Sequence, residues 1–291
     1  MSVAEVNISI PVDLTNPGQF FACCGLLELA DRLWPGAEGW FEGGRFCIAA
    51  PDVSLASVLH AVTQSRVANT MKPEQIARLH ELSNMKKKER TDAMEEEKKT
   101  LESLRRELPV VLNGTVPFRI DWFRDDCAGG SRFKTWAGQQ SVLDIALAMH
   151  DGMKSVPDYN ESTLWNSIRG IGLPFNFDSD LGGQGSALDI GFSFDPLAGR
   201  ETTRVEGSCK PALELLCFIG LQRFRPREIK GENRFVYTAW ERRLSPNVAA
   251  AVACQAVQLS PAPTYEFRLL YRTDYLKSFL PAQRFQGERD E

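Results

Sequence analysis

Hydrophobic and polar residues alternate along residues 5–12, and the apolar side chains of this stretch fall on one face, which predicts a strand. A largely apolar stretch follows over residues 17–34. Asn16 is placed to cap a helix there, and Pro17 stands at the first helical position, where a proline costs no hydrogen bond. The sequence therefore predicts a strand followed by a helix.

Apolar residues occupy almost every face of this predicted helix. Only a narrow stripe around Glu28, Asp31 and Arg32 is polar, and we expect that stripe to reach solvent. The rest of the helix is expected to be buried on most sides.

The next segments complete an order of elements that defines a fold. Residues 40–41 and 46–48 are apolar and flank a glycine pair, which predicts a hairpin. Asp52 is placed to cap a second helix, and a later strand is predicted over residues 116–123. The order strand, helix, strand, strand, helix, strand is that of a ferredoxin-like fold, so we predict a ferredoxin-like α+β half over residues 1–150.

A charged segment, residues 72–108, interrupts this order before its last strand. It holds ten lysines and arginines against nine aspartates and glutamates, and its middle has hardly an apolar residue. We predict a helical insertion, as two helices or one long helix, that projects from the body. A solvated hairpin and a contact with a partner protein or nucleic acid are both open interpretations.

The second half of the chain, residues 151–291, is predicted to be a mixed α+β unit. No linker separates it from the first half, so the boundary is placed near residues 150–160, with a single domain as the alternative. The predicted elements are two strands within 175–195, a helix over 211–224, a strand over 233–241, a helix that begins at Pro246 and a strand over 265–271.

Composition is that of a globular protein. Of the 291 residues, 43% are hydrophobic and 25% are charged, which argues against disorder. The net charge is −4, so any binding of nucleic acid must rest on a local basic patch.

Targeting signals and cysteine usage bear on location. The sequence opens without a basic segment and apolar core, and no apolar run approaches the roughly 20 residues of a membrane-spanning helix. The seven cysteines form no C-x-x-C pair. We therefore expect a cytoplasmic protein with no membrane partner.

The motifs of common enzyme classes are missing. His60, His80 and His150 have no partners at metal-ligand spacing, and the sequence contains no phosphate-binding loop, nucleophile elbow or dinucleotide fingerprint. We predict a protein that is not an enzyme and that uses no cofactor and no metal.

Two acidic groups keep a metal hypothesis open. The first is Asp121, Asp125 and Asp126, and the second is Asp178, Asp180 and Asp189. The first group could bind Mg²⁺ in a metal-dependent nuclease. The second invites a calcium interpretation, but lacks the alternating ligands and closing glutamate of an EF-hand loop.

One candidate nucleic-acid-binding segment spans residues 120–140. A glycine pair there is followed by cationic, aromatic and amide side chains: Arg132, Lys134, Trp136, Gln139 and Gln140. Cations neutralise phosphates, a tryptophan offers a stacking face, and glutamines can pair with base edges. The structural alternative is a strand–helix junction with Trp136 in the core.

A second candidate is a basic stripe within residues 223–243. Its cations in the predicted site are Arg223, Arg225, Arg227, Lys230 and Arg234. The first three alternate, so in an extended stretch they would share one face. Such a stripe could bind nucleic acid, or it could receive an acidic protein partner.

Three stretches together resemble a known family. They are TNPGQFFACCGLLELADRLWPGAEGWF near the start, DWF with FKTWAGQQ in the middle, and ELLCFIGLQRFRP later. They resemble the small version of the large, or signature, subunit of the type I-U (I-G) CRISPR Cascade complex. The likeness covers most of the chain apart from the charged segment.

The resemblance implies a role in RNA-guided interference against invading DNA. Large subunits of this kind sit at the crRNA 5′ end, recognise the protospacer-adjacent motif in double-stranded target DNA, and help recruit the helicase–nuclease. The implied partners are therefore crRNA, target DNA, the Cascade backbone subunits and the helicase–nuclease. A metal-dependent nuclease and a purely structural, protein-contact subunit are the competing hypotheses.

Overall fold

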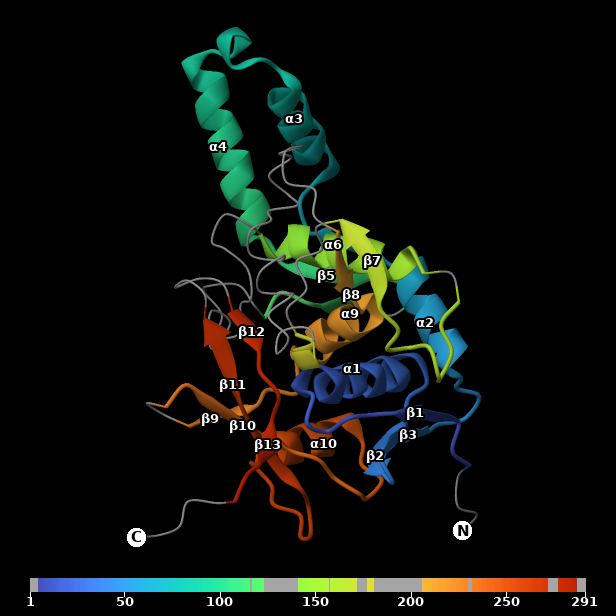
Figure 1. Cartoon of the computed structure of the whole chain (residues 1–291). Coiled ribbons are helices and arrows are strands. Elements are labelled where there is room, and N and C mark those ends of the chain that lie inside the picture. The colour runs from blue at the N-terminus through green and yellow to red at the C-terminus, as the bar shows by residue number, and fades with distance from the viewer. Residues whose placement is uncertain are drawn as a thin grey trace.

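The computed structural model describes most of the chain, and we refer throughout to this described part. It comprises residues 5–115, 117–122, 141–156, 158–171, 177–180, 206–229, 232–271 and 277–286. Within it the protein is a mixed α/β structure with seven α-helices and several small antiparallel sheets (Figure 1). No helix in these ranges is long and apolar enough to span a membrane.

The chain begins with a strand, a helix and a hairpin. Strand β1 (Ile8–Pro11) leads into helix α1 (Pro17–Leu33), which is followed by β2 (Glu38–Glu42) and β3 (Arg45–Ala49). The three strands form an antiparallel sheet in the order β1-β3-β2.

Helix α1 begins where its sequence signals place it. The side chain of Asn16 accepts a hydrogen bond from the backbone N–H of Gln19, and Pro17 occupies the first turn. All residues from Pro17 to Ala30 are buried. The prediction that the polar stripe reaches solvent is therefore wrong at Glu28, which is 4% exposed. Two arginines cover its carboxylate and neutralise its charge.

The next helix is capped differently from the prediction. Helix α2 (Leu55–Gln64) is capped by Ser54, whose hydroxyl accepts the N–H of Ser57 at 3.1 Å. Asp52, the predicted cap, instead lies in a turn with a φ of 57°. Ser54 and Ser57 form a reciprocal capping box, which satisfies two backbone donors and moves the helix start.

The ferredoxin-like arrangement is not confirmed. The order β1, α1, β2, β3 matches it, but β6 (Phe118–Arg119), within the predicted last strand, pairs with β5 (Val110–Asn113). These strands belong to a second sheet with the order β4-β5-β6, in which β4 spans Arg66–Asn69. A ferredoxin-like fold would instead place its last strand beside β1.

The charged segment forms a helical hairpin that projects from the body (Figure 1). It consists of α3 (Pro73–Asn84), the 3₁₀ turn η1 (Lys87–Glu89) and α4 (Asp92–Glu107). The hairpin connects β4 to β5, and we call residues 70–109 the arm.

Over the described residues after β6, the structure has three helices, a two-stranded sheet and a five-stranded antiparallel sheet in which β13 pairs with β11. The helices are α6 (Val142–Lys154), α9 (Pro211–Gly220) and α10 (Pro246–Ala253). The strands are β7 (Ile168–Ile171), β8 (Glu206–Cys209), β9 (Arg227–Ile229), β10 (Arg234–Thr238), β11 (Thr264–Tyr271), β12 (Lys277–Phe279) and β13 (Gln283–Arg284).

One hydrophobic core joins the two predicted halves. Helix α1 packs along α9, and aromatic rings from α1 meet rings from the C-terminal sheet. The ring centroids of Phe20 and Tyr237 are 4.4 Å apart, and those of Phe21 and Tyr237 are 5.5 Å apart. The arm has a small apolar cluster of its own, formed around Leu79, Leu82 and Leu101.

Candidate nucleic-acid interface

Four of the ten predicted site residues lie in the described part of the chain. They are Arg223, Arg225, Arg227 and Arg234. The other six, Arg132, Lys134, Trp136, Gln139, Gln140 and Lys230, lie outside the described residues. The geometry therefore bears on the second candidate segment.

Arg223 is bound within the protein. It belongs to the turn after α9, and its Nε lies 2.9 Å from Oε2 of Glu28 on α1. Arg32 binds the other oxygen of the same carboxylate at 2.5 Å. Since Glu28 is buried, these contacts fix α9 against α1.

Arg234 is likewise held by carboxylates. From β10 it binds Glu266 on β11 through two of its nitrogens, and Glu232 at 2.5 Å through the third. The hydrogen bond to Glu266 is the main reason that its pKa is raised. This arginine joins neighbouring strands, and its charge is compensated.

Arg225 and Arg227 have a different setting, because both are exposed. The guanidinium of Arg225 lies over the ring of Trp122, 4.6 Å from its centroid, in cation–π geometry. Arg227 begins β9, and its Nε donates to Oε1 of Gln255 at 2.7 Å. The carboxamide of Gln255 is neutral, so that bond does not compensate the charge of Arg227.

The expected alternation of three arginines on one face does not hold. The extended stretch begins only at Arg227, and the residues before it form a turn and an irregular segment. The ion pair with buried Glu28 directs the Arg223 side chain toward α1 instead of toward solvent. Two arginines, Arg225 and Arg227, remain exposed from the predicted group.

The stretches that carry the family resemblance meet in space. Glu28 comes from the first stretch, Trp122 from the second, and Arg223 and Arg225 from the third. In addition to the ring contact, the backbone N–H of Trp122 donates to Oε1 of Gln222 at 2.8 Å. No local signal indicates that Trp122 would support Arg225, because about a hundred residues separate them.

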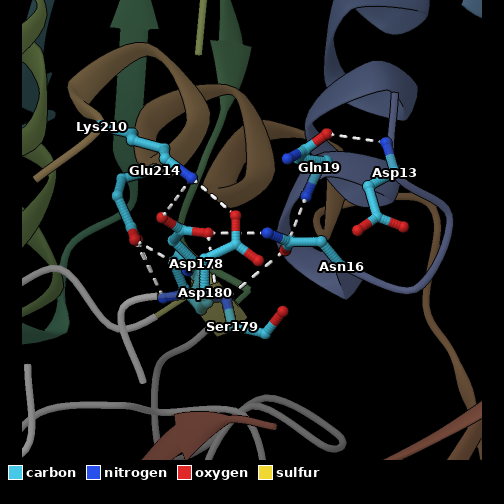
Figure 2. A network of polar contacts seen from close by, with 9 residues as sticks. Asp13, Asn16, Gln19, Asp178, Ser179, Asp180, Lys210 and Glu214 are labelled. Atoms are coloured by element: carbon cyan, nitrogen blue, oxygen red, sulfur yellow. Dashed lines mark hydrogen bonds and ion pairs between the residues drawn. The ribbon is translucent and has the colours of Figure 1, made fainter. Parts of the chain in front are cut away.

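Asp178 and Asp180 of the second acidic group belong to a polar network in which the Asp178 side chain is buried (Figure 2). Lys210 lies between Asp178 and Asp180, with its Nζ 2.9 and 2.8 Å from their carboxylate oxygens. Asn16 donates to the other oxygen of Asp178 at 2.7 Å, and buried Glu214 accepts the N–H of Asp178 at 2.9 Å. The network ties residues 177–180 to the start of α1 and to α9.

A lysine supplies the positive charge in this network. Burial alone would lower the pKa of Lys210, but Asp178 and Asp180 together raise it above its ordinary value. The third residue of the calcium hypothesis, Asp189, lies outside the described residues. In the described ranges no three His, Cys, Asp or Glu side chains come together as a metal site.

The nuclease hypothesis depends on residues of which one can be placed. Asp121 is 4% exposed and accepts two hydrogen bonds from Arg119, at 3.1 and 2.8 Å. Asp125 and Asp126 lie outside the described residues. Asp121 is thus engaged in a bidentate ion pair beside the sheet.

A cleft of about 750 Å³ lies between the arm, β4 and α6. Its lining includes apolar Ile76, Leu79 and Leu147 together with cationic Arg66 and Lys154. None of the described side chains that line it is a phenylalanine, tyrosine or tryptophan.

A scan against protein-family models finds no match for this chain, and a search of curated proteins finds none either. The resemblance to the Cascade large subunit therefore rests on the three quoted stretches.

Proposed function

We propose that this chain is a non-catalytic nucleic-acid-binding subunit of a type I-G Cascade complex in the cytoplasm. It contributes to binding of the crRNA 5′ end, to recognition of the protospacer-adjacent motif in double-stranded DNA, and to recruitment of the helicase–nuclease. The observation that carries the proposal is the meeting of the three resembling stretches, with exposed Arg225 over Trp122 and exposed Arg227 two residues further along the chain. The ferredoxin-like assignment of the first half remains part of the proposal, supported by the β1, α1, β2, β3 order.

The two exposed arginines suit phosphate binding. Stacking on Trp122 holds the guanidinium of Arg225 in a defined plane, which reduces the entropy cost when it binds a phosphate. Arg227 is fixed through one nitrogen by Gln255 and has further N–H donors to offer. Arg223 and Arg234 serve the fold, so they are not suitable residues for a binding test.

The test is the salt dependence of binding by a variant that lacks both exposed charges. An Arg225→Gln, Arg227→Gln protein is compared with wild type on a 30-base-pair duplex and on an RNA of crRNA length. Removal of one phosphate contact should lower the log–log salt slope by about 0.9 on the duplex, or about 1.8 for the pair. A Lys98→Gln, Lys99→Gln protein removes equal charge from lysines that are already paired with glutamates, and should match wild type.

Unchanged affinity and slope of the arginine variant in the assembled complex would exclude this surface as the nucleic-acid face. The surface would then be assigned to an acidic protein partner, as in the structural-subunit hypothesis. Metal-dependent cleavage of DNA or RNA that disappears in an Asp125→Ala, Asp126→Ala variant would favour the nuclease hypothesis instead.

The residues 132–140 remain a prediction with a separate test. A glutamine that reads a base edge, at Gln139 or Gln140, should cost about 1–3 kcal/mol on the preferred motif when replaced by alanine, and little on scrambled DNA. Equal losses on both DNAs would exclude base reading by these side chains.

A further inference from the structure

The arm occupies the place of a simple turn. Strands β4 and β5 are antiparallel neighbours, and the register ends with Asn69 opposite Val110. Two residues are enough to join antiparallel strands at such a point. Residues 70–109 are therefore not needed to close the sheet. A segment of this length between two paired strands suggests a function other than connecting them.

Contacts within the arm hold it as one rigid element. Leu79 and Leu82 of α3 pack with Leu101 of α4. Arg78 donates to both carboxylate oxygens of Glu97, at 3.0 and 2.8 Å, and so joins the two helices. These hydrogen bonds raise the pKa of Arg78 and lower that of Glu97.

The turn at the tip is also fixed. Arg90 donates two hydrogen bonds to the carbonyl oxygen of Met85, at 3.2 and 2.8 Å, and a third to Glu95 at 2.7 Å. The bond from Arg90 is the main reason that the pKa of Glu95 is lowered. The positive charge of Arg90 is thus used inside the arm.

Three lysines remain at the tip. Lys86, Lys87 and Lys88 are exposed, and none lies within ion-pair distance of a carboxylate in the described part of the chain. The acid beside them, Glu89, accepts the backbone N–H of Lys86 at 3.3 Å. In α4, Glu95 and Glu97 bind Arg90 and Arg78. Glu96 pairs with Lys99, and Glu102 pairs with Lys98.

The arm carries these charges away from a protein whose net charge is −4. Helix α4 has 16 residues, which corresponds to a length of about 24 Å. That length exceeds the Debye length of about 8–10 Å, so the acidic body is screened from a ligand at the tip.

We infer that the tip of the arm is a phosphate-binding element that contacts the backbone of duplex nucleic acid through Lys86, Lys87 and Lys88. The inference rests on the proposed function and adds to it a second contact surface, on a different element from Arg225 and Arg227.

The side-chain arrangement favours a duplex over an acidic protein surface or a single strand. Lys87 and Lys88 lie in a 3₁₀ turn that follows Lys86, whose backbone is extended, and successive side chains of such a turn point about 120° apart. A flat acidic surface would meet only some of them, whereas the strands that border a groove present phosphates on both sides. Residues 85–91 include no aromatic side chain on which an unpaired base could stack.

The test uses the full-length protein and a 30-base-pair duplex of mixed sequence, titrated at several salt concentrations. A Lys86→Gln, Lys87→Gln, Lys88→Gln variant should lower the log–log salt slope by about 2.7, at about 0.9 for each contact. A Lys72→Gln, Lys98→Gln, Lys99→Gln variant removes the same charge from the rest of the arm and should keep the wild-type slope.

Different failures give different results. If the tip variant keeps the wild-type slope and affinity while the Arg225, Arg227 variant weakens, the inference is overturned and the proposed function stands. If wild type binds neither duplex nor RNA at low salt, both are overturned. If the tip variant binds duplex normally but no longer co-purifies with the Cascade backbone subunits, the tip is a protein-docking element and the inference is wrong.

Discussion

Gly25 of α1 and Gly220 of α9 face each other at a point where the two helix backbones touch. A Cβ atom placed on Gly25 would lie 2.0 Å from the carbonyl oxygen of Leu216, and one placed on Gly220 would lie 2.0 Å from that of Phe21. No side chain fits in this space. Both glycines belong to stretches that carry the family resemblance, so at least part of that resemblance has a packing cause.

Gly25→Ala and Gly220→Ala should each destabilise the protein. In an ordinary helix, replacing glycine by alanine stabilises by about 0.5–1 kcal/mol. Here the added methyl group meets a backbone carbonyl, and the helices must separate, which we expect to cost about 1–3 kcal/mol. The free energy of unfolding in urea gives the answer. An increase in stability for either variant would show that the helices are not in backbone contact.

Local signals predicted the first elements of the fold because those elements are locally determined. Asn16 and Pro17 fix the start of α1, which was predicted over 17–34 and spans Pro17–Leu33. Strand pairing was not predictable in the same way. Residues 116–123 carry a strand pattern that does not say whether the partner is β1 or β5, because pairing depends on packing between distant segments.

In the candidate site, too, some features follow from the local sequence and others depend on contacts between distant residues. The sequence identified Arg223 and Arg225 as members of one basic stripe. It could not show that Glu28, far away in the chain, would bind Arg223, or that Trp122 would lie under Arg225. The charge of a residue is local information, whereas its compensation depends on the tertiary fold.

Lys210→Met should strongly destabilise the protein. The lysine is the cation between Asp178, whose side chain is 1% exposed, and Asp180. Its Nζ lies 2.9 Å from Oδ2 of Asp178 and 2.8 Å from Oδ2 of Asp180. Removing one partner of a buried ion pair leaves an uncompensated charge, at a cost of about 3–5 kcal/mol. Thermal and urea unfolding measure the loss.

The matched control for this prediction is Lys99→Met. Lys99 pairs with Glu96 on the exposed face of α4, with 67% and 74% of the two side chains exposed. Exposed pairs contribute about 0–1 kcal/mol, so this variant should unfold almost as wild type does. Equal losses for the Lys210 and Lys99 variants would mean that the buried network is not a stabilising feature.

His150 should make stability depend on pH. Its Nε2 lies 3.0 Å from the carbonyl oxygen of Val62, to which it donates. Burial is the main cause that lowers its pKa below the ordinary value of 6.5, and Lys154 lowers it further. Between the lowered pKa and 6.5 the unfolded chain binds a proton that the folded protein does not. The contribution of this histidine is therefore present above pH 6.5 and is lost as the pH falls below it.

A His150→Gln variant tests this dependence. The glutamine keeps an N–H donor for Val62 and removes the titrating group, so the decline in stability below pH 6.5 should be shallower than in wild type. His60→Gln removes an exposed imidazole from α2 and serves as the control. Parallel pH profiles for wild type and His150→Gln would show that His150 is not a source of acid sensitivity.

Replacing the arm, residues 70–109, by an Asn-Gly turn should leave a protein that folds cooperatively. The apolar cluster of the arm is separate from the main core. One ion pair joins the arm to α6 in the described structure, Arg105 with Asp144 at 2.8 Å, and it is partly exposed, so its loss costs at most about 1 kcal/mol. For a chain of this size that corresponds to a fall in Tm of only about 2–4 °C.

Calorimetry measures this fall in Tm. The glutamine variant of the three tip lysines, whose Tm should not change, is the reference. A broad or absent transition would mean that the arm is part of the folding unit, and that loss of DNA binding on its removal could not be assigned to the tip.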